Sequence, residues 1–190
     1  MYKVVFDIES QNTFLEAESN NPADLDISVV SLYDYQTDEY TTVDLDNLHT
    51  LWPILEKTNL LIGYNSDHFD IPLLNKYYPE DLNQIRSLDI LREIKSSYGR
   101  RMKLDQVAEG TLGIKKSGHG LQAITWWRKG EIEKIKEYCQ DDVRITKELY
   151  DYALANNHLK FKEGSEIMQI NLDTSHWEKP EEKAQTNSLF

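Results

Sequence analysis

Alternating apolar and polar residues near the start of the chain predict a β-strand over residues 4–9 (Val-Val-Phe-Asp-Ile-Glu). Successive side chains of a strand lie on opposite faces. One face of this strand is therefore wholly apolar, and the other carries the carboxylates of Asp7 and Glu9. Residues 27–35 and 40–45 have the composition of two further strands joined by a short turn, which indicates an antiparallel start to a sheet.

A different pattern follows these strands. Apolar residues recur at helical spacing over residues 45–57, and residues 60–64 form a compact apolar run typical of a strand buried on both faces. Because this run follows a helix, we expect it to pair parallel to the first strand. A second helix begins near Asp70, with Pro72 in its first turn. Asp70 can cap that helix, or it can bind a ligand at the carboxyl end of a central strand.

The second half of the chain is predicted to be mostly helical. A short strand near Leu88 leads into a helix with Asp89 as its candidate cap. The remaining predicted elements are helices over 104–111, 120–127 and 131–155 and a β-hairpin built from 159–162 and 167–172. We expect an α/β domain over residues 1–155, an appended β-hairpin over 156–176 and a disordered tail over 177–190.

The predicted helix over residues 131–155 carries one acid within its apolar stripe. Apolar side chains recur every three or four residues from Ile135 onward, except that the stripe contains Asp142. A carboxylate on a buried helix face is costly unless it accepts hydrogen bonds or binds a metal. Tyr138 lies one turn before Asp142 on the same face, and Cys139 is predicted to be a small core residue.

The pair of Asp7 and Glu9 favours a divalent cation. Two carboxylates held on one face of a strand repel each other and shift each other's pKa values. Carboxylate oxygens suit Mg²⁺ or Mn²⁺, and such an ion would offset the repulsion. The alternative is an edge strand whose charged face lies in water.

Composition and charge limit the classes of function. The chain has 190 residues, enough for one domain, and its net charge of −12 argues against binding nucleic acid by general electrostatic attraction. A single cysteine excludes an internal disulfide and favours a reducing compartment such as the cytoplasm. The sequence has no apolar run of the length that spans a membrane and no N-terminal signal.

The middle of the chain is basic. Between Arg86 and Lys136 there are twelve basic and six acidic residues, an excess of six positive charges in an acidic protein. With Trp126 and Trp127 beside Arg128, this segment can hold a phosphate backbone and stack bases. The alternative is solvated helix faces with two core tryptophans.

Three short motifs together resemble those of the DEDD 3′–5′ exonucleases. Residues 7–9 (Asp-Ile-Glu) match the first motif. Residues 63–70 (Gly-Tyr-Asn-Ser-Asp-His-Phe-Asp) resemble the second, in the form found in proofreading domains of family B DNA polymerases. Residues 138–142 (Tyr-Cys-Gln-Asp-Asp) resemble the third in its tyrosine version, and Glu137 stands where the histidine version has its base. The likeness is greatest to stand-alone bacterial and phage relatives of the polymerase domain.

This resemblance implies a ribonuclease H-like fold, with a mixed five-stranded sheet and helices on both faces. It also implies two divalent ions, Mg²⁺ or Mn²⁺, about 4 Å apart. Asp7 would bridge both ions, with Glu9 and Asp142 completing the first site. Asp70 would hold the second ion through water, and Tyr138 would orient the attacking water.

The activity implied by the resemblance is release of nucleoside 5′-monophosphates from the 3′ end of a nucleic acid. Single-stranded DNA is favoured over RNA as the substrate, and a replication or repair protein is a candidate partner. Phe14 or Leu15 would wedge against the terminal base, and Asn65 would position the second motif or contact the substrate backbone. The full set of candidate substrate-binding residues is Asn65, Phe14, Leu15, Phe69, Arg100, Arg101, Lys115, Lys116 and His119.

Other classes of function stay open. One is a catalytically silent nucleic-acid-binding or scaffolding module on the same fold. Another is an exoribonuclease, because no residue identified in the sequence reads the 2′-hydroxyl group. An endonuclease or resolvase of the same superfamily is disfavoured by Tyr138, which is an exonuclease feature.

Overall fold

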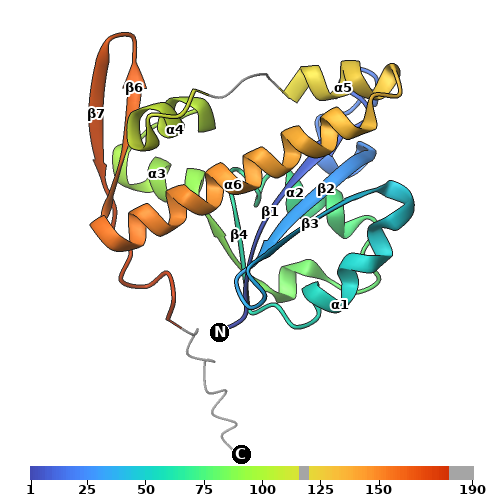
Figure 1. The fold of residues 1–190 in the computed structure, drawn as a ribbon, viewed down its shortest axis with the longest axis horizontal. Helices are drawn as coiled ribbons and strands as arrows, with labels where there is room; N and C mark the ends of the chain where they lie inside the picture. Colours follow the sequence, from blue (N-terminus) through green and yellow to red (C-terminus); the bar gives the residue numbers. More distant parts are fainter. Residues whose placement is uncertain (116–119, 180–190) are drawn as a thin grey trace, which may run out of the picture.

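The computed structural model describes residues 1–115 and 120–179, and these contain two sheets (Figure 1). The larger sheet has five strands in the order β3-β2-β1-β4-β5, and the smaller pairs β6 with β7. The strands are β1 (Lys3–Ser10), β2 (Ile27–Asp34), β3 (Glu39–Asp44), β4 (Leu60–Gly63), β5 (Arg86–Asp89), β6 (His158–Glu163) and β7 (Glu166–Asn171). The α-helices are α1 (Trp52–Leu55), α2 (Asp70–Asn75), α3 (Ile90–Tyr98), α4 (Leu104–Leu112), α5 (Gly120–Arg128) and α6 (Ile132–Asn156). The connections also contain 3₁₀ helices at Pro22–Asp24, Leu45–Leu51 and Leu82–Gln84.

Strand β1 lies at the centre of the five-stranded sheet, with both of its edges paired. It runs antiparallel to β2 and parallel to β4. Its side chains alternate between two faces, as the sequence predicted: Phe6 and Ile8 lie in one hydrophobic cluster, and Val5 lies in another. Because side chains alternate along a strand, Asp7 and Glu9 continue the face of Val5.

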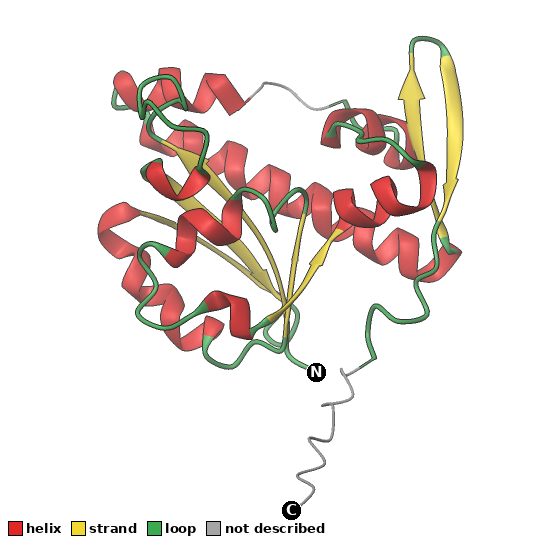
Figure 2. Ribbon diagram, turned by 180° about the vertical axis from the view of Figure 1, so that it is seen from behind, coloured by secondary structure: helices red, strands yellow, loops and turns green. Residues whose placement is uncertain are grey.

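Helices cover both faces of this sheet, as predicted (Figures 1 and 2). The long helix α6 packs on β1, β2 and β3. The shorter helices α1 and α2 contribute apolar side chains to the cluster of Phe6 on the other face. The charged face of β1 is thus covered by a helix, so the edge-strand alternative is wrong. Among the described residues, no helix is both long enough and apolar enough to cross a lipid bilayer.

One predicted helix is divided in the structure. The segment predicted to be helical over residues 45–57 forms the 3₁₀ helix Leu45–Leu51 and then the short helix α1. Pro53 lies in the first turn of α1. A proline has no N–H to donate to the preceding turn, and it is tolerated only where a helix starts. It therefore separates the two short helices, a break that the apolar spacing alone did not predict.

The β6–β7 hairpin confirms the predicted C-terminal hairpin and packs on the main domain through α4. Phe161 of β6 is fully buried in one of the two cores. Gly110 of α4 approaches so closely that a Cβ atom there would lie 2.5 Å from the Cα atom of Phe161. The Thr111 hydroxyl donates to the carbonyl of Lys160 at 2.6 Å and accepts from its N–H at 2.8 Å. These contacts fix the hairpin to the domain.

The segment after β7 also packs on the domain. Trp177 is fully buried and stacks on Tyr150, with ring centroids 5.7 Å apart. Its indole N–H donates to Glu93, and Glu178 pairs with Lys3 of β1. An ordered contact thus replaces the disorder that the sequence predicted for residues 177 and 178. The rest of the predicted tail, 180–190, lies outside the described residues.

We predict that Gly110→Ala lowers the stability of the protein. Within a helix, alanine is ordinarily favoured over glycine by about 1 kcal/mol. Here the added Cβ would collide with the backbone of Phe161, and overpacking of this kind costs about 1–3 kcal/mol. Urea denaturation of the variant and the wild type measures the difference in free energy of unfolding. A gain in stability would show that the hairpin is not held against α4 in solution.

Candidate metal centre and active site

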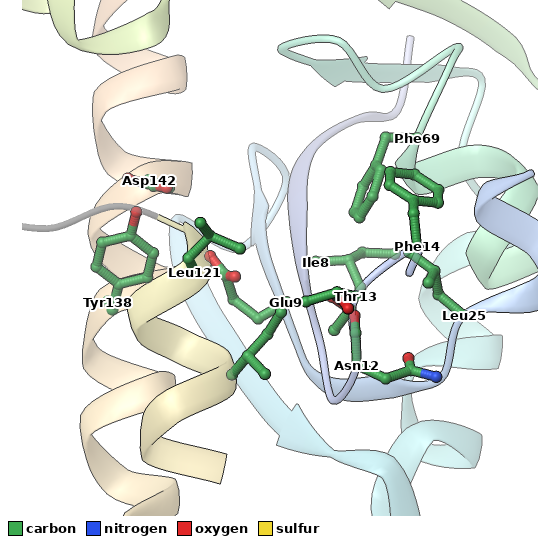
Figure 3. A pocket seen from close by; sticks show the side chains of 12 residues that line it. Ile8, Glu9, Asn12, Thr13, Phe14, Leu25, Phe69, Leu121, Tyr138 and Asp142 are labelled. Carbon is green, nitrogen blue, oxygen red and sulfur yellow. Dashed lines mark hydrogen bonds between the residues drawn. The ribbon is translucent and has the colours of Figure 1, made fainter. Parts of the chain in front are cut away.

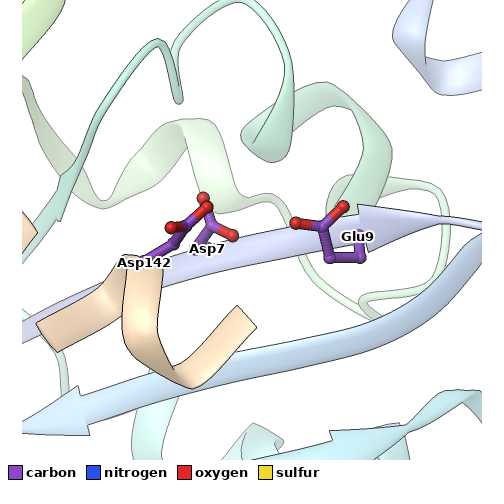
Figure 4. A group of neighbouring side chains, drawn as sticks. All are labelled: Asp7, Glu9 and Asp142. Atoms are coloured by element: carbon purple, nitrogen blue, oxygen red, sulfur yellow. The ribbon is translucent and has the colours of Figure 1, made fainter. Parts of the chain in front are cut away.

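Strand β1 and helix α6 bring three of the predicted carboxylates together (Figure 4). Asp7 and Glu9 come from the covered face of β1, and Asp142 comes from the packed face of α6. One carboxylate oxygen of each residue lies within 4.8 Å of the others. Glu9 and Asp142 are buried, and Asp7 is partly exposed. The acid in the apolar stripe of α6 therefore lies against the acidic face of β1.

Asp70, the fourth predicted carboxylate, is the first residue of α2 and is 3% exposed. The cap position of this helix belongs to Phe69, and the carboxylate of Asp70 accepts a hydrogen bond from the backbone N–H of Ile8. This N–H is available because the pairing of β1 with β4 ends at Val5. The Oδ1 atom of Asp70 has no hydrogen-bond partner among the described residues. Asp70 thus lies beside β1, but it is not one of the three residues whose carboxylate oxygens lie within 4.8 Å of one another.

The surroundings of Asp70 disfavour its ionised form. Burial, together with the negative charges of Asp89 and Asp142, raises the pKa of Asp70 to about 8, although the hydrogen bond from Ile8 acts in the opposite direction. A carboxyl group with this environment ionises readily only when a positive charge is close.

Cys139 lies behind the carboxylates, on α6. Its thiol donates to the main-chain oxygen of Asp7 at 3.2 Å and approaches the Oδ2 atom of Asp7 at 3.6 Å. Burial raises the pKa of this thiol well above its usual value, and the charges of Asp7, Glu9, Asp142 and Asp70 act in the same direction. Cys139 is therefore a neutral, buried residue, as the helical pattern predicted, and four carboxylates surround it.

The chemistry of these residues fits a divalent cation. The closely spaced carboxylates of Asp7, Glu9 and Asp142 repel one another, and a buried oxygen of Asp70 lacks a hydrogen-bond donor among the described residues. A hard cation such as Mg²⁺ or Mn²⁺ takes oxygen ligands and would relieve both conditions. Asp7, Glu9 and Asp142 are close enough together to share one ion.

Tyr138 lies next to this cluster. Its side chain is buried, one turn before Asp142 on α6, and its ring meets the edge of Trp126 with centroids 5.8 Å apart. Trp126 and Trp127 are partly buried against a small cluster of apolar residues. The structure thus favours the alternative in which the two tryptophans are packing residues.

A pocket of about 430 Å³ opens beside the cluster (Figure 3). Glu9, Asp142 and Tyr138 line one part of it. The rest is lined by the loop after β1, including the polar Asn12 and Thr13, and by apolar side chains of α5 and of the segment before α2. Phe14 and Phe69 form one wall, with their rings edge to face at 6.2 Å. The pocket therefore joins an acidic end to an aromatic wall.

Residues 4–154 match the family model of the RNase_H superfamily. The chain belongs to the RNase_H superfamily. A search of curated proteins gave no match. Among solved structures, the chain is similar to the family B DNA polymerase from the hyperthermophilic archaeon Pyrobaculum calidifontis, with a TM-score of 0.63 and 19% sequence identity. The similarity covers 81% of this chain and 24% of the polymerase, so the chain spans about a quarter of that protein's length.

This membership confirms the predicted ribonuclease H-like fold. The similarity to the polymerase, at 19% identity, supports the fold. Among the residues that the structure describes, the carboxylates of Asp7, Glu9 and Asp142 on β1 and α6 could bind a divalent metal.

The predicted substrate-binding residues of this RNase_H-superfamily protein are divided between several places. Phe14 lines the pocket, whereas Leu15 is 86% exposed and does not. Arg101 donates to the side-chain oxygen of Asn65, at the end of β4. Lys115 is exposed beyond α4. The remaining predicted residues Lys116 and His119 lie outside the described residues.

Arg100 lies apart from the second motif. Its guanidinium donates to both carboxylate oxygens of Glu163 at 3.0 and 2.7 Å and lies over the ring of Phe161. Both partners are residues of β6, so Arg100 interacts with the hairpin. Other basic residues of the middle segment are also engaged within the protein: Arg92 pairs with Asp67, and Arg128 pairs with Glu16. The local positive charge therefore serves in part to hold acidic segments in place.

Asp89 has a larger role than the sequence indicated. It caps α3, as predicted, by accepting from the backbone N–H groups of Leu91 and Arg92. The same buried carboxylate also accepts from the N–H groups of Asn65 and Asp67, within the second motif. The sequence did contain an indication of this role, because Asp89 lies at the end of a second parallel strand, and such sheets bind ligands at the carboxyl ends of their strands.

We predict that, without divalent ions, stability falls as the pH rises from about 5 to about 8. The pKa of Asp70 in the folded state, about 8, exceeds the value near 3.9 of an unfolded aspartate, so the folded state binds more protons in this window. Each pH unit then removes up to about 1.4 kcal/mol of stability. Thermal melts in EDTA across this range should show the fall in the wild type and a flatter profile in Asp70→Asn.

The exposed Asp46 provides the control. Asp46→Asn should keep the wild-type dependence on pH. Parallel profiles for Asp70→Asn and the wild type would contradict the assignment of the pH dependence to Asp70.

Proposed function

We propose that this protein is a metal-dependent 3′–5′ exonuclease of the tyrosine DEDD type, which releases nucleoside 5′-monophosphates from single-stranded DNA. The observation that carries this proposal is the convergence of Asp7, Glu9 and Asp142, with Asp70 and Tyr138 beside them. These residues come from three separate motifs whose order and composition resemble those of DEDD exonucleases. Membership of the RNase_H superfamily supports the coarser assignment as a nuclease.

The carboxylates would hold two divalent ions. Asp7, Glu9 and Asp142 would hold one, and Asp70 would hold the second together with Asp7. Mg²⁺ or Mn²⁺ bound there supplies Lewis-acid stabilisation of the phosphate and lowers the pKa of water. The role of the protein is to hold these carboxylates close together on rigid elements.

Tyr138 would orient the attacking water. A phenol ordinarily has a pKa near 10, which suits it to hydrogen bonding rather than to removing a proton at neutral pH. Its contact with Trp126 restrains the ring, and its position in the pocket beside Asp142 allows the hydroxyl to meet a water at the acidic end.

The aromatic wall of the pocket would receive the terminal base. Phe14 and Phe69 present ring surfaces to the pocket, and base–aromatic contacts of this type are tolerant of sequence. Leu121 of α5, which is 70% exposed, also lines this pocket. A 3′-terminal nucleotide would thus have its base among apolar groups and its phosphate at the carboxylates.

We predict that Asp142→Asn abolishes hydrolysis, because the variant loses a charge at the cluster while keeping the shape of the side chain. The neighbouring Asp141 is the matched control: it pairs with Arg144 and does not belong to the cluster. Asp141→Asn should retain activity within about threefold, the effect of a weak surface ion pair. The assay is a gel time course with 5′-labelled DNA and RNA of one sequence, in Mg²⁺, Mn²⁺ or EDTA.

A metal-dependent ladder that shortens from the 3′ end, absent for Asp142→Asn, is the expected result. Internal cuts would instead indicate an endonuclease. Preference for the RNA strand would indicate an exoribonuclease. The absence of cleavage with either metal would overturn the proposal and favour a binding module on the same fold.

A second prediction separates the two adjacent arginines. Arg101 contacts Asn65 of the second motif, so we expect it to reach a substrate phosphate, whereas Glu163 holds Arg100 on the hairpin. Arg101→Gln should raise KM by about fivefold, and reduce the slope of log affinity against log salt by about 1. Arg100→Gln should change neither quantity. Equal effects of both variants would show that the substrate does not pass along the second motif.

A further inference from the structure

We propose that Asp89 is a positioning residue for Asp70: its buried carboxylate fixes the main chain of the second motif and so holds Asp70 at the metal centre. This inference rests on the proposed function, in which Asp70 holds the second ion. It adds a fifth acidic residue that acts through the backbone and not as a metal ligand.

A single carboxylate joins two segments here. Asp89 is 4% exposed at the end of β5, where it pairs with Gly63 of β4. Its Oδ1 atom accepts from the N–H of Asn65 at 2.8 Å, and its Oδ2 atom accepts from the N–H of Asp67 at 3.3 Å. The Oδ1 atom also accepts from Leu91 at 2.9 Å, in the first turn of α3. Hydrogen bonds to a buried charge are stronger than those between neutral groups.

The loop that Asp89 holds has a demanding conformation. Asn65 lies in the left-handed region, with φ of 66°, which few non-glycine residues adopt. Ser66 then turns inward and is fully buried, and a Cβ atom on Gly63 would lie 2.4 Å from the Cβ atom of Ser66. A glycine is therefore required at the end of β4. The bonds from Asn65 and Asp67 to Asp89 stabilise this reversal of the chain.

The reversal leads directly into α2 and Asp70. The carbonyl of Asn65 accepts from the N–H of Phe69 at 3.1 Å, and the carbonyl of Ser66 accepts from Ile71 at 2.9 Å. Asp70 lies between these two bonded residues. Its carboxylate is repelled by the negative charges of Asp89 and Asp142, which act to displace it. A fixed main chain on the other side of the loop resists that displacement.

The first ion does not depend on this loop. Asp7, Glu9 and Asp142 project from β1 and α6, which are held by the sheet and by the core. Loss of Asp89 should therefore weaken one ion and spare the other. A general loss of structure would weaken both, and this difference distinguishes positioning from mere stability.

The test is a Mn²⁺ titration of the full chain followed by electron paramagnetic resonance, which measures free Mn²⁺ directly. The wild type should bind two ions and Asp70→Asn only one. Asp89→Asn retains an oxygen for the cap of α3 and loses the charge. It should weaken the second ion by about 10–100-fold, the usual effect of losing a group that orients a metal ligand, and leave the first unchanged. In the Asp70→Asn background, Asp89→Asn should have no further effect.

Two additional variants serve as controls. Asp81 is also an N-cap aspartate, accepting from the N–H of Asn83 at 3.0 Å. It accepts hydrogen bonds from Asn75, Asn83 and Gln84, and none of these residues belongs to the second motif. Asp81→Asn should leave both ions unchanged. Asp89→Ser keeps a good cap for α3 with a side chain too short to bridge to Asn65, so it should repeat the effect of Asp89→Asn if that variant folds poorly.

Equal weakening of both ions, or no weakening, in both Asp89 variants would overturn the proposal. Two ions retained by Asp70→Asn would overturn it together with the role of Asp70, while the gel assay would still report on exonuclease activity. A wild type that cleaves from the 3′ end and an Asp89→Asn variant with unchanged Mn²⁺ binding would leave the proposed function intact and reject only the positioning role.

Discussion

Repulsion among carboxylates around β1 is the constraint that the rest of the structure must withstand. Asp7, Glu9 and Asp142 have carboxylate oxygens within 4.8 Å of one another, and the charges of these three residues and of Asp70 all raise the pKa of the buried thiol of Cys139. Rigid elements of the fold hold the carboxylates in place against this repulsion. β1 is paired on both edges, α6 packs across three strands, and a neutral thiol fills the space behind the acids. An acidic cluster can persist because none of its members is carried by a long loop.

The pocket combines two kinds of surface that suit the two ends of a nucleotide. Its acidic end repels a phosphate unless cations are bound, and its aromatic wall is neutral. With a net charge of −12, the protein as a whole offers little long-range attraction to a polyanion. Affinity for nucleic acid should therefore depend on cations at one small site more than on the general surface.

Local patterns in the sequence were sufficient for the strands and for the placement of three carboxylates. Asp7 and Glu9 alternate with apolar residues, and Asp142 interrupts an apolar stripe, so each pattern fixed the direction of its side chain. Features that depend on pairing between distant segments were not predictable in this way. Asp89 contacts Asn65 only because β5 pairs with β4, and Arg100 and Arg101, adjacent in the sequence, have different partners. Pro53 could have indicated the break between the two short helices, but the apolar spacing over residues 45–57 predicted one continuous helix.

Trp177 was missed because its neighbours are polar, yet it has a consequence for the order of assembly. Its ring stacks on Tyr150, and Glu178 next to it pairs with Lys3 at the other end of the described chain. A contact between residues so distant in sequence carries an entropic cost, because the intervening chain must be closed into a long loop. During synthesis on a ribosome, the core would lack one of its largest side chains until residue 177 leaves the exit tunnel. Completion of the domain is thereby coupled to synthesis of the segment that follows the hairpin.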